Sequence, residues 1–224
     1  MRPIIPGPWK RLEKWLAENF SAGYLDLNPG CDEEVVEAAE DELGVELPDS
    51  LKRVYRLHDG QQSEGSSVGI FYGVCFLPLR EMVLIWRSWR ETDDLIEKEG
   101  LKDSLDEHQI SFAPSRVRPI YSCELWIPFG RIAENSYLGL DFYPASEGVK
   151  GQVINFGRDE EQKTVLADSF EEFVRSYVAE LELGNFMIVE DEQRGTRFLP
   201  KTRANRVLDR QSPYGGAVAT RFID

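Results

Sequence analysis

Cysteine and histidine are scarce in this sequence, which has three cysteines and two histidines among 224 residues. Cys31, Cys75 and Cys123 lie far apart and form no C-x-x-C pair. Three isolated thiols and two histidines do not provide the ligand spacing of a zinc site or a disulfide framework. We therefore predict no metal site, and we expect the cysteines to be free thiols in a reducing cytoplasm.

The motifs of common enzymes are also missing. The sequence contains no glycine-rich phosphate loop, no H-E-x-x-H, no G-x-S-x-G and no EF-hand spacing. His58 beside Asp59 is the one pair that suggests a general base, but no nucleophile motif follows it. We therefore predict a protein that is not an enzyme and binds no cofactor, with His58 hydrogen-bonded locally at a helix end. An enzyme that uses His58 and Asp59 is a third hypothesis, ranked below the two binding functions given at the end of this section.

Long apolar runs are absent as well. No stretch of 18 apolar residues occurs, and the first residues lack the apolar core of a secretory signal. We therefore predict no membrane-spanning segment, no membrane partner and a cytoplasmic location.

Basic residues are few, with 26 Lys and Arg against 40 Asp and Glu and a formal net charge of −14. This balance excludes a general nucleic-acid binder, because neutralising phosphates supplies non-specific affinity. The charge is uneven: residues 31–184 carry a net −17, whereas residues 193–221 hold seven basic residues and one acid, Asp209. The shift predicts a domain over 9–189 and a basic C-terminal extension over 190–224.

Apolar residues recur at helical spacing in five segments. Asp32 and Ser169 stand at helix-start positions, Pro48 suits a first turn, and Gly44 and Gly184 suit helix ends. The helices are predicted over residues 8–20, 32–43, 48–58, 78–98 and 169–183. Residues 101–113 are poorly periodic and predict a short helix or a loop.

Strand patterns dominate the second half of the chain. A hairpin around Gly73 is predicted over 68–77, and further strands over 117–122, 126–129, 136–142, 152–156, 163–167 and 185–189. Several of these strands follow one another without an intervening helix, which favours antiparallel pairing. The predicted fold class is therefore α+β, with a mainly antiparallel sheet of about five to six strands and helices packed on one face.

Four stretches together resemble a known family. They are Asn28-Pro29-Gly30 with residues 39–48 and 57–61; residues 69–72 with 76–79; residues 126–129, 138–144 and 148–154; and residues 165–173. In this order and spacing, over residues 9–186, they resemble the SUKH superfamily. That superfamily includes a fungal cell-wall and stress regulator and many bacterial toxin-immunity proteins. Ala133 to Ser136 depart from the Gly-rich turn that the family usually has there.

Most signature residues have a structural explanation. We expect Gly60 to end a helix, Asp59 to tie the turn, and Glu40 to accept hydrogen bonds from backbone amides of the turn at residues 47–49. Asp141 faces inward from a strand and needs a partner, for which Arg118 and Arg131 are candidates. The signature residues are Gly30, Glu40, Gly44, Pro48, His58, Asp59, Gly60, Trp126, Pro128, Asp141 and Gly151.

Acidic runs remain after these assignments. Each is explained most simply as a solvated face, and the alternative is a surface that meets a basic partner, with association steered by charge. An exposed aromatic ring, Tyr72, would anchor the dry centre of such an interface. The predicted partner-binding residues are Glu33, Glu34, Glu37, Asp41, Tyr72, Asp93, Asp94, Glu97, Asp159 and Glu160.

The resemblance and the charge together imply a non-catalytic binding protein, acting as a monomer or weak homodimer. The first prediction is a cytoplasmic immunity protein that neutralises a basic, nuclease-type toxin by stoichiometric binding. The alternative is a regulatory or scaffold module of cell-wall or stress signalling.

Overall fold

Five antiparallel strands form the central sheet of the computed structural model, which describes residues 7–62, 69–133, 135–191, 195–200, 211–212 and 216–217. Their order across the sheet is β1-β3-β4-β5-β7. The bounds are β1 Cys75–Phe76, β3 Trp126–Ala133, β4 Ser136–Asp141, β5 Gln152–Gly157 and β7 Val165–Ala167. The predicted α+β class with an antiparallel meander is confirmed.

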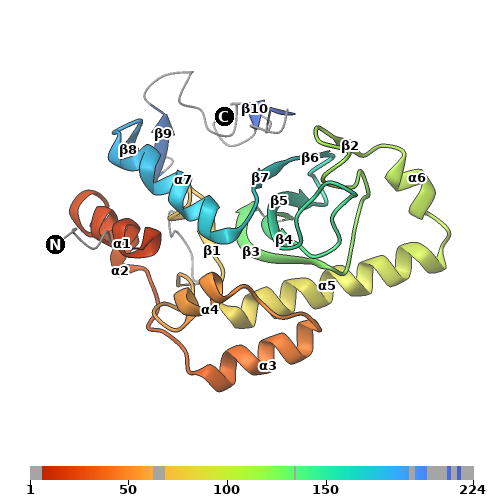
Figure 1. The fold of residues 1–224 in the computed structure, drawn as a ribbon, viewed down its shortest axis with the longest axis horizontal. Coiled ribbons are helices and arrows are strands. Elements are labelled where there is room, and N and C mark those ends of the chain that lie inside the picture. Colours follow the sequence, from red (N-terminus) through yellow and green to blue (C-terminus); the bar gives the residue numbers. More distant parts are fainter. Residues whose placement is uncertain are drawn as a thin grey trace.

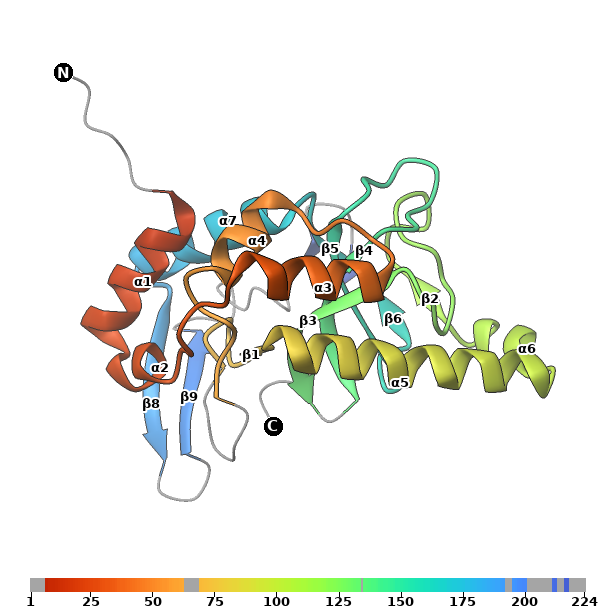
Figure 2. The ribbon, with the colours of Figure 1, turned by 90° about the horizontal axis from the view of Figure 1, so that it is seen from below.

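Seven helices surround this sheet in the described residues. They are α1 Pro8–Asn19, α2 Ser21–Leu25, α3 Glu33–Leu43, α4 Asp49–Tyr55, α5 Leu79–Lys98, α6 Lys102–Asp106 and α7 Phe170–Glu182. Helices α1 and α2 lie at one end of the long axis and α6 at the other (Figure 1). Figure 2 shows α3 alongside α5, against which it packs.

The helix predictions need three corrections. Helix α4 ends at Tyr55 rather than at His58, and Pro48 is its N-cap residue rather than part of its first turn. Asp32 occupies the N-cap position of α3, but its side chain makes no capping hydrogen bond. Two predicted caps are confirmed. Ser169, the N-cap of α7, accepts a hydrogen bond from Glu172 N, and Gly44, the C-cap of α3, is left-handed with φ 67°.

Both faces of the sheet are covered, so β4 and β5 are buried along their whole length. On one face Ile127, Phe129 and Leu140 join the apolar residues of α1, α3, α4 and α7 in the larger core. On the other face Trp126 and Phe156 belong to a smaller cluster. The predicted packing of helices on one face of the sheet is therefore confirmed for the face that carries the larger core.

An irregular segment over residues 112–124 covers the second face and replaces the strand predicted over 117–122. Val117 is fully buried there against the smaller cluster. Pro119 cannot donate a hydrogen bond to a strand ladder, which argues against a strand at this position. Before it, the short strand β2, Ile110–Ser111, pairs in parallel with β6, Gln162–Lys163.

The C-terminal part of the described chain begins with a hairpin. Strand β8, Phe186–Asp191, pairs antiparallel with β9, Gly195–Pro200, and the buried Phe186 belongs to the larger core. Strand β8 runs through residue 190, the predicted start of the extension, and that boundary remains a prediction. Strands β10, Gln211–Ser212, and β11, Gly216–Ala217, form a separate pair. Most of the basic residues of 193–221 lie outside the described residues.

Among the described residues, no helix is both long and apolar enough to cross a bilayer.

Two left-handed glycines allow a matched stability test. Gly44 has φ 67° and open space where a Cβ would stand, whereas Gly60 has φ 68° and a Cβ would lie 2.2 Å from Pro78 N. We expect Gly44→Ala to lower the free energy of unfolding by about 1–2 kcal/mol, the cost of a left-handed alanine. Gly60→Ala adds a backbone clash and should cost clearly more. Urea denaturation of both variants measures the difference, and equal losses would contradict the described turn.

Candidate protein-interaction surface

Helix α3 presents an acidic stripe to solvent. Val36, Ala39 and Leu43 are buried on its inner face. Glu34, Glu37 and Asp41 stand at positions i, i+3 and i+7 on its exposed surface, and we call these three residues the α3 acidic stripe. No ion pair involving them occurs among the described residues. The stripe therefore leaves three carboxylates of one sign available on one helix face.

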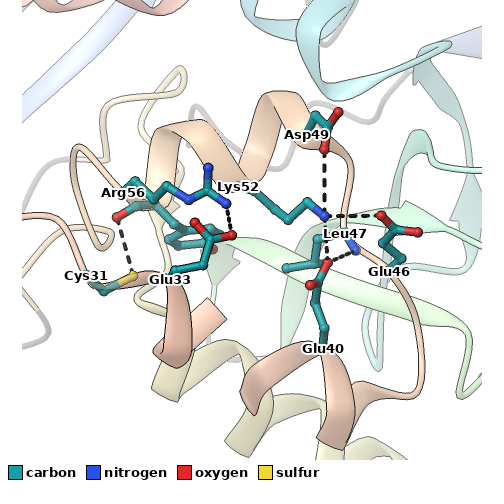
Figure 3. Close-up of polar contacts among 9 residues, drawn as sticks. Cys31, Glu33, Glu40, Glu46, Leu47, Asp49, Lys52 and Arg56 are labelled. Atoms are coloured by element: carbon teal, nitrogen blue, oxygen red, sulfur yellow. Dashed lines mark hydrogen bonds and ion pairs between the residues drawn. The ribbon is translucent and has the colours of Figure 1, made fainter. Parts of the chain in front are cut away.

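Arginines from neighbouring helices flank this stripe. Arg56 at the end of α4 pairs with Glu33, and Arg87 of α5 pairs with Glu42, with Arg87 Nε donating to Glu42 Oε1 at 3.1 Å (Figure 3 shows the first pair). Glu33 was predicted to bind a partner, but its carboxylate already contacts a cation within the chain.

Lys52 of α4 lies among three carboxylates, one of which belongs to α3. Its Nζ is 3.3 Å from Glu40 Oε1, 3.2 Å from Glu46 Oε1 and 3.7 Å from Asp49 Oδ1 (Figure 3). Desolvation lowers the pKa of Lys52, but hydrogen bonds to Glu46 and Glu40 outweigh it and raise that pKa above its usual value. Sequence reasoning missed Lys52 because its partners come from three separate positions along residues 40–49.

The same Glu40 oxygen holds the turn between α3 and α4. Leu47 N donates to Glu40 Oε1 at 2.6 Å, so the predicted hydrogen bond from a backbone amide of this turn is present. One carboxylate thus satisfies a backbone donor and a lysine from two elements. We call this contact, made by Glu40, Leu47 N and Lys52, the Glu40 clamp. It fixes α3, and with it the α3 acidic stripe, relative to α4.

The segment around Gly30 packs directly on the end of α4. A Cβ at Gly30 would stand 2.0 Å from the carbonyl oxygen of Arg56, which only glycine permits. Asn28 Nδ2 donates to the carbonyls of Asp59 at 2.8 Å and Gln61 at 3.0 Å. These contacts explain why the Asn28-Pro29-Gly30 and Leu57 to Gln61 motifs occur together.

His58 and Asp59 make structural contacts in different directions. His58 Nδ1 lies 3.1 Å from Asn28 O, and His58 Nε2 lies 2.8 Å from Glu13 Oε1 of α1. Asp59 Oδ1 instead accepts from Leu79 N at 2.8 Å, at the start of α5. Burial raises the pKa of Asp59, and the bond from Leu79 opposes this rise. The pair therefore connects α1, the Asn28 turn and α5.

Asp141 is fully buried at the end of β4, and its predicted arginine partners are wrong. Its carboxylate accepts from Trp126 Nε1 at 3.0 Å, Gln152 Nε2 at 2.9 Å and Tyr143 N at 2.9 Å. Arg131 pairs with Glu81 of α5 at 2.6 Å, and Arg118 donates to the carbonyl of Tyr143 at 3.3 Å. Desolvation raises the pKa of Asp141, and these neutral donors and the charge of Arg118 oppose the rise.

Three further signature residues lie around this network. Trp126 supplies one of the donors, and Gly151, with φ 84°, donates its N–H to the carbonyl of Asp141 at 2.7 Å. Pro128 pairs with Gly139 next to an irregularity in the β3–β4 ladder, where a residue without an N–H is tolerated.

Tyr72 is not a free anchor, which corrects its predicted role. Its ring centroid lies 4.2 Å from that of Tyr177 and 4.8 Å from that of Phe186. Its N–H donates to Tyr177 Oη at 3.3 Å, and its φ of 54° is left-handed. The ring therefore packs within the chain, between the turn at Gly73, α7 and β8.

The other predicted acids do not extend the α3 acidic stripe. Asp93 accepts from Lys102 Nζ at 3.0 Å and from Ser122, and Glu160 accepts from Asn155 Nδ2 at 2.9 Å. Asp94 and Glu97 are exposed toward the C-terminal end of α5, and Asp159 is exposed in the turn after β5. Within the described residues, no group of three His, Cys, Asp or Glu side chains is arranged to hold a metal ion.

Comparison with known proteins gives one family and several relatives. The model of the SMI1 / KNR4 family (SUKH-1) matches residues 30–176. Cell wall biosynthesis/cell cycle regulator smi1 of Schizosaccharomyces pombe is 30% identical over 194 residues, covering 85% of this chain and 38% of that protein. KNR4/SMI1 homolog 2 of Debaryomyces hansenii is 29% identical, covering 86% and 38%. Cell wall assembly regulator SMI1 of Saccharomyces cerevisiae is 28% identical, covering 82% and 41%. The chain thus spans about two fifths of the length of these relatives.

The Glu40 clamp predicts a graded response to substitution. Glu40→Ala leaves the Leu47 N–H without its acceptor and should lower the free energy of unfolding by about 1–3 kcal/mol. Glu40→Gln keeps an acceptor oxygen and should cost less. Glu46→Gln, at a side chain that is 83% exposed, serves as the control and should change little. Urea denaturation of the three variants measures the order, and a loss for Glu46→Gln as large as for Glu40→Ala would contradict it.

The raised pKa of Asp141 predicts a pH dependence of stability. A carboxyl whose folded-state pKa exceeds its unfolded value keeps its proton longer in the folded state, so stability falls as pH rises between the two values. Relative to Asp141→Asn, the wild-type chain should lose unfolding free energy from about pH 4 upward, by at most about 1.4 kcal/mol per pH unit. Urea denaturation of both proteins from pH 4 to pH 7 measures this difference. If the unfolding free energy of the wild type rises with pH relative to that of Asp141→Asn, the pKa of Asp141 is lowered by its hydrogen bonds more than it is raised by burial, and the prediction is wrong.

Proposed function

We propose that this chain, which belongs to the SMI1/KNR4 family (SUKH-1), is a protein-binding module that serves the regulation of cell-wall assembly. The observation that carries the proposal is the similarity over more than four fifths of the chain to proteins named as regulators of cell-wall assembly and the cell cycle. Because the chain spans about two fifths of those proteins, the proposal concerns the module and not their whole activity.

The contacts of His58 and Asp59 support a binding role rather than catalysis. Both ring nitrogens of His58 are engaged with Asn28 and Glu13, and Asp59 accepts from the first amide of α5. A general base must reach a substrate proton, and these two side chains are instead used to connect elements of the fold.

The α3 acidic stripe is the surface that we assign to the partner. Its three carboxylates project from a helix that the Glu40 clamp fixes, and they are exposed. Charges of one sign on an exposed surface steer association with a partner of opposite sign and suppress wrong partners. The expected partner is therefore a protein with a basic contact surface, and binding should weaken as salt concentration rises.

The toxin-immunity function, placed first by sequence reasoning, shares this physical basis but lacks support from the relatives named above. Their names agree with the regulatory alternative. Immunity would require that the chain rescue cells from a cognate toxin module, whereas regulation requires that it work within the longer relatives.

A chimera tests the proposal. In S. cerevisiae, this chain would replace the matching segment of cell wall assembly regulator SMI1, and growth on a cell-wall-binding dye would be scored. We expect the chimera to restore growth, and Glu34→Lys/Glu37→Lys/Asp41→Lys within it to abolish the restoration by reversing the stripe. The matched control, Glu99→Lys/Asp103→Lys/Glu107→Lys, changes three exposed acids near α6 and should restore growth.

Two outcomes would count against the proposal. If the unaltered chimera is expressed and folded but does not restore growth, the regulatory function is wrong for this chain. If the stripe variant restores growth as well as the control, the function stands and the binding face lies elsewhere. The unfolding free energies of the purified stripe variant and control variant should agree to within about 0.5 kcal/mol, as for exposed substitutions in general.

A further inference from the structure

A groove lies among α1, α4 and the start of α7. It encloses about 430 Å³, within the range of sites that hold small ligands or single side chains of a partner. Its surface is mainly apolar, with Trp9, Val54, Leu57, Phe170 and Val174 in the lining. An apolar groove between helices is a common place for a peptide to bind.

Trp9 lines this groove and carries a buried indole N–H donor. Its ring packs near Phe71 and Phe76, with centroid distances of 6.2 and 5.8 Å, and its side chain is only 7% exposed. Its Nε1 is buried and has no hydrogen-bond partner among the residues that the structure describes. Buried indole N–H groups usually find an acceptor, and none of the described residues supplies one to Trp9.

Basic side chains border the groove although the chain as a whole is acidic. Lys10 and Arg53 belong to the lining, and Lys10 forms no ion pair among the described residues. Glu171, the acid of the lining, pairs with Arg175 at 2.7 Å and approaches Arg53 at 4.0 Å. The lining therefore carries two cations against one acid, and its net charge is positive.

We propose that the groove binds a short linear segment of a partner protein in which a large apolar residue stands next to an acidic residue. The apolar side chain enters the groove, a backbone carbonyl of the segment accepts from Trp9 Nε1, and the acidic residue pairs with Lys10 and Arg53. The inference rests on the proposed function as a protein-binding module, and it adds a second contact of opposite charge preference to that of the α3 acidic stripe.

Peptide selection on the full chain tests this inference. A display library of random 12-residue peptides is selected on the wild-type chain and counter-selected on Lys10→Glu/Arg53→Glu. We expect the enriched peptides to carry Asp or Glu within three positions of Leu, Phe or Trp. The most enriched synthetic peptide should bind at least tenfold more weakly to Lys10→Glu/Arg53→Glu. The matched variant Arg80→Glu/Lys98→Glu, on the exposed side of α5, should bind it normally.

The Trp9 donor provides an independent readout. In ¹H–¹⁵N spectra the indole resonance that disappears in Trp9→Phe is that of Trp9, and it should shift downfield when the peptide is added. Trp9→Phe keeps an aromatic ring but no donor, and it should weaken the peptide about fivefold. If Trp9→Phe is misfolded, binding of the peptide to Lys10→Glu/Arg53→Glu still decides the question.

Several results would overturn the inference. These are the absence of any peptide that distinguishes wild type from Lys10→Glu/Arg53→Glu, the enrichment of basic peptides, and peptide binding without a change at the Trp9 indole. Self-association that Lys10→Glu/Arg53→Glu abolishes would also overturn it, because the occupant would then be a second copy of the chain. None of these results affects restoration of growth by the chimera, so failure here is distinguishable from failure of the proposed function.

Discussion

The contact between Glu40 and the turn that follows α3 is the constraint on which the candidate interface depends. A single carboxylate accepts from Leu47 N at 2.6 Å and lies 3.3 Å from Lys52 Nζ, so α3 and α4 cannot shift independently. The inner face of α3 packs on α5, and its outer face carries Glu34, Glu37 and Asp41. The polar contact therefore determines where the three charges of the α3 acidic stripe stand, although it contributes little to the apolar core.

A second consequence concerns the net charge. The excess of acid is not a uniform coat, because Arg56 and Arg87 flank α3 and Lys52 is surrounded by carboxylates. Charge remains available at the α3 acidic stripe, while the groove at Trp9 is bordered by basic side chains. Two surfaces of opposite sign on one domain can engage two segments of a partner, or two partners, each with its own charge preference.

The fold was largely predictable because its signals are local. Helical spacing identified five helices, left-handed glycines such as Gly44 marked their ends, and consecutive strands indicated the antiparallel meander. The strand expected at 117–122 was wrong because its apolar residues fit a buried irregular segment as well as a strand, and Pro119 prevents regular pairing. Periodicity alone does not distinguish these two arrangements.

The site was less predictable because its contacts join distant residues. Tyr72 appears as an exposed aromatic in a turn, yet Tyr177 and Phe186, more than 100 positions away, cover it. Asp141 was expected to need a cation, but three neutral donors converge on it, one of them from Gln152 on the adjacent strand. The Trp9 groove combines residues from three helices, and no motif in the sequence brings them together.

The most direct test of the central claim is position-specific photocrosslinking in living cells. A photoreactive amino acid at Ala38, an exposed position of α3 beside the acidic stripe, would be compared in the S. cerevisiae chimera with the same residue at Asp103 of α6. The account predicts a discrete crosslinked protein at position 38, lost when Glu34, Glu37 and Asp41 are changed to Lys, and none at position 103. Equal crosslinking at both positions, or crosslinking at position 38 that survives the charge reversal, would contradict it.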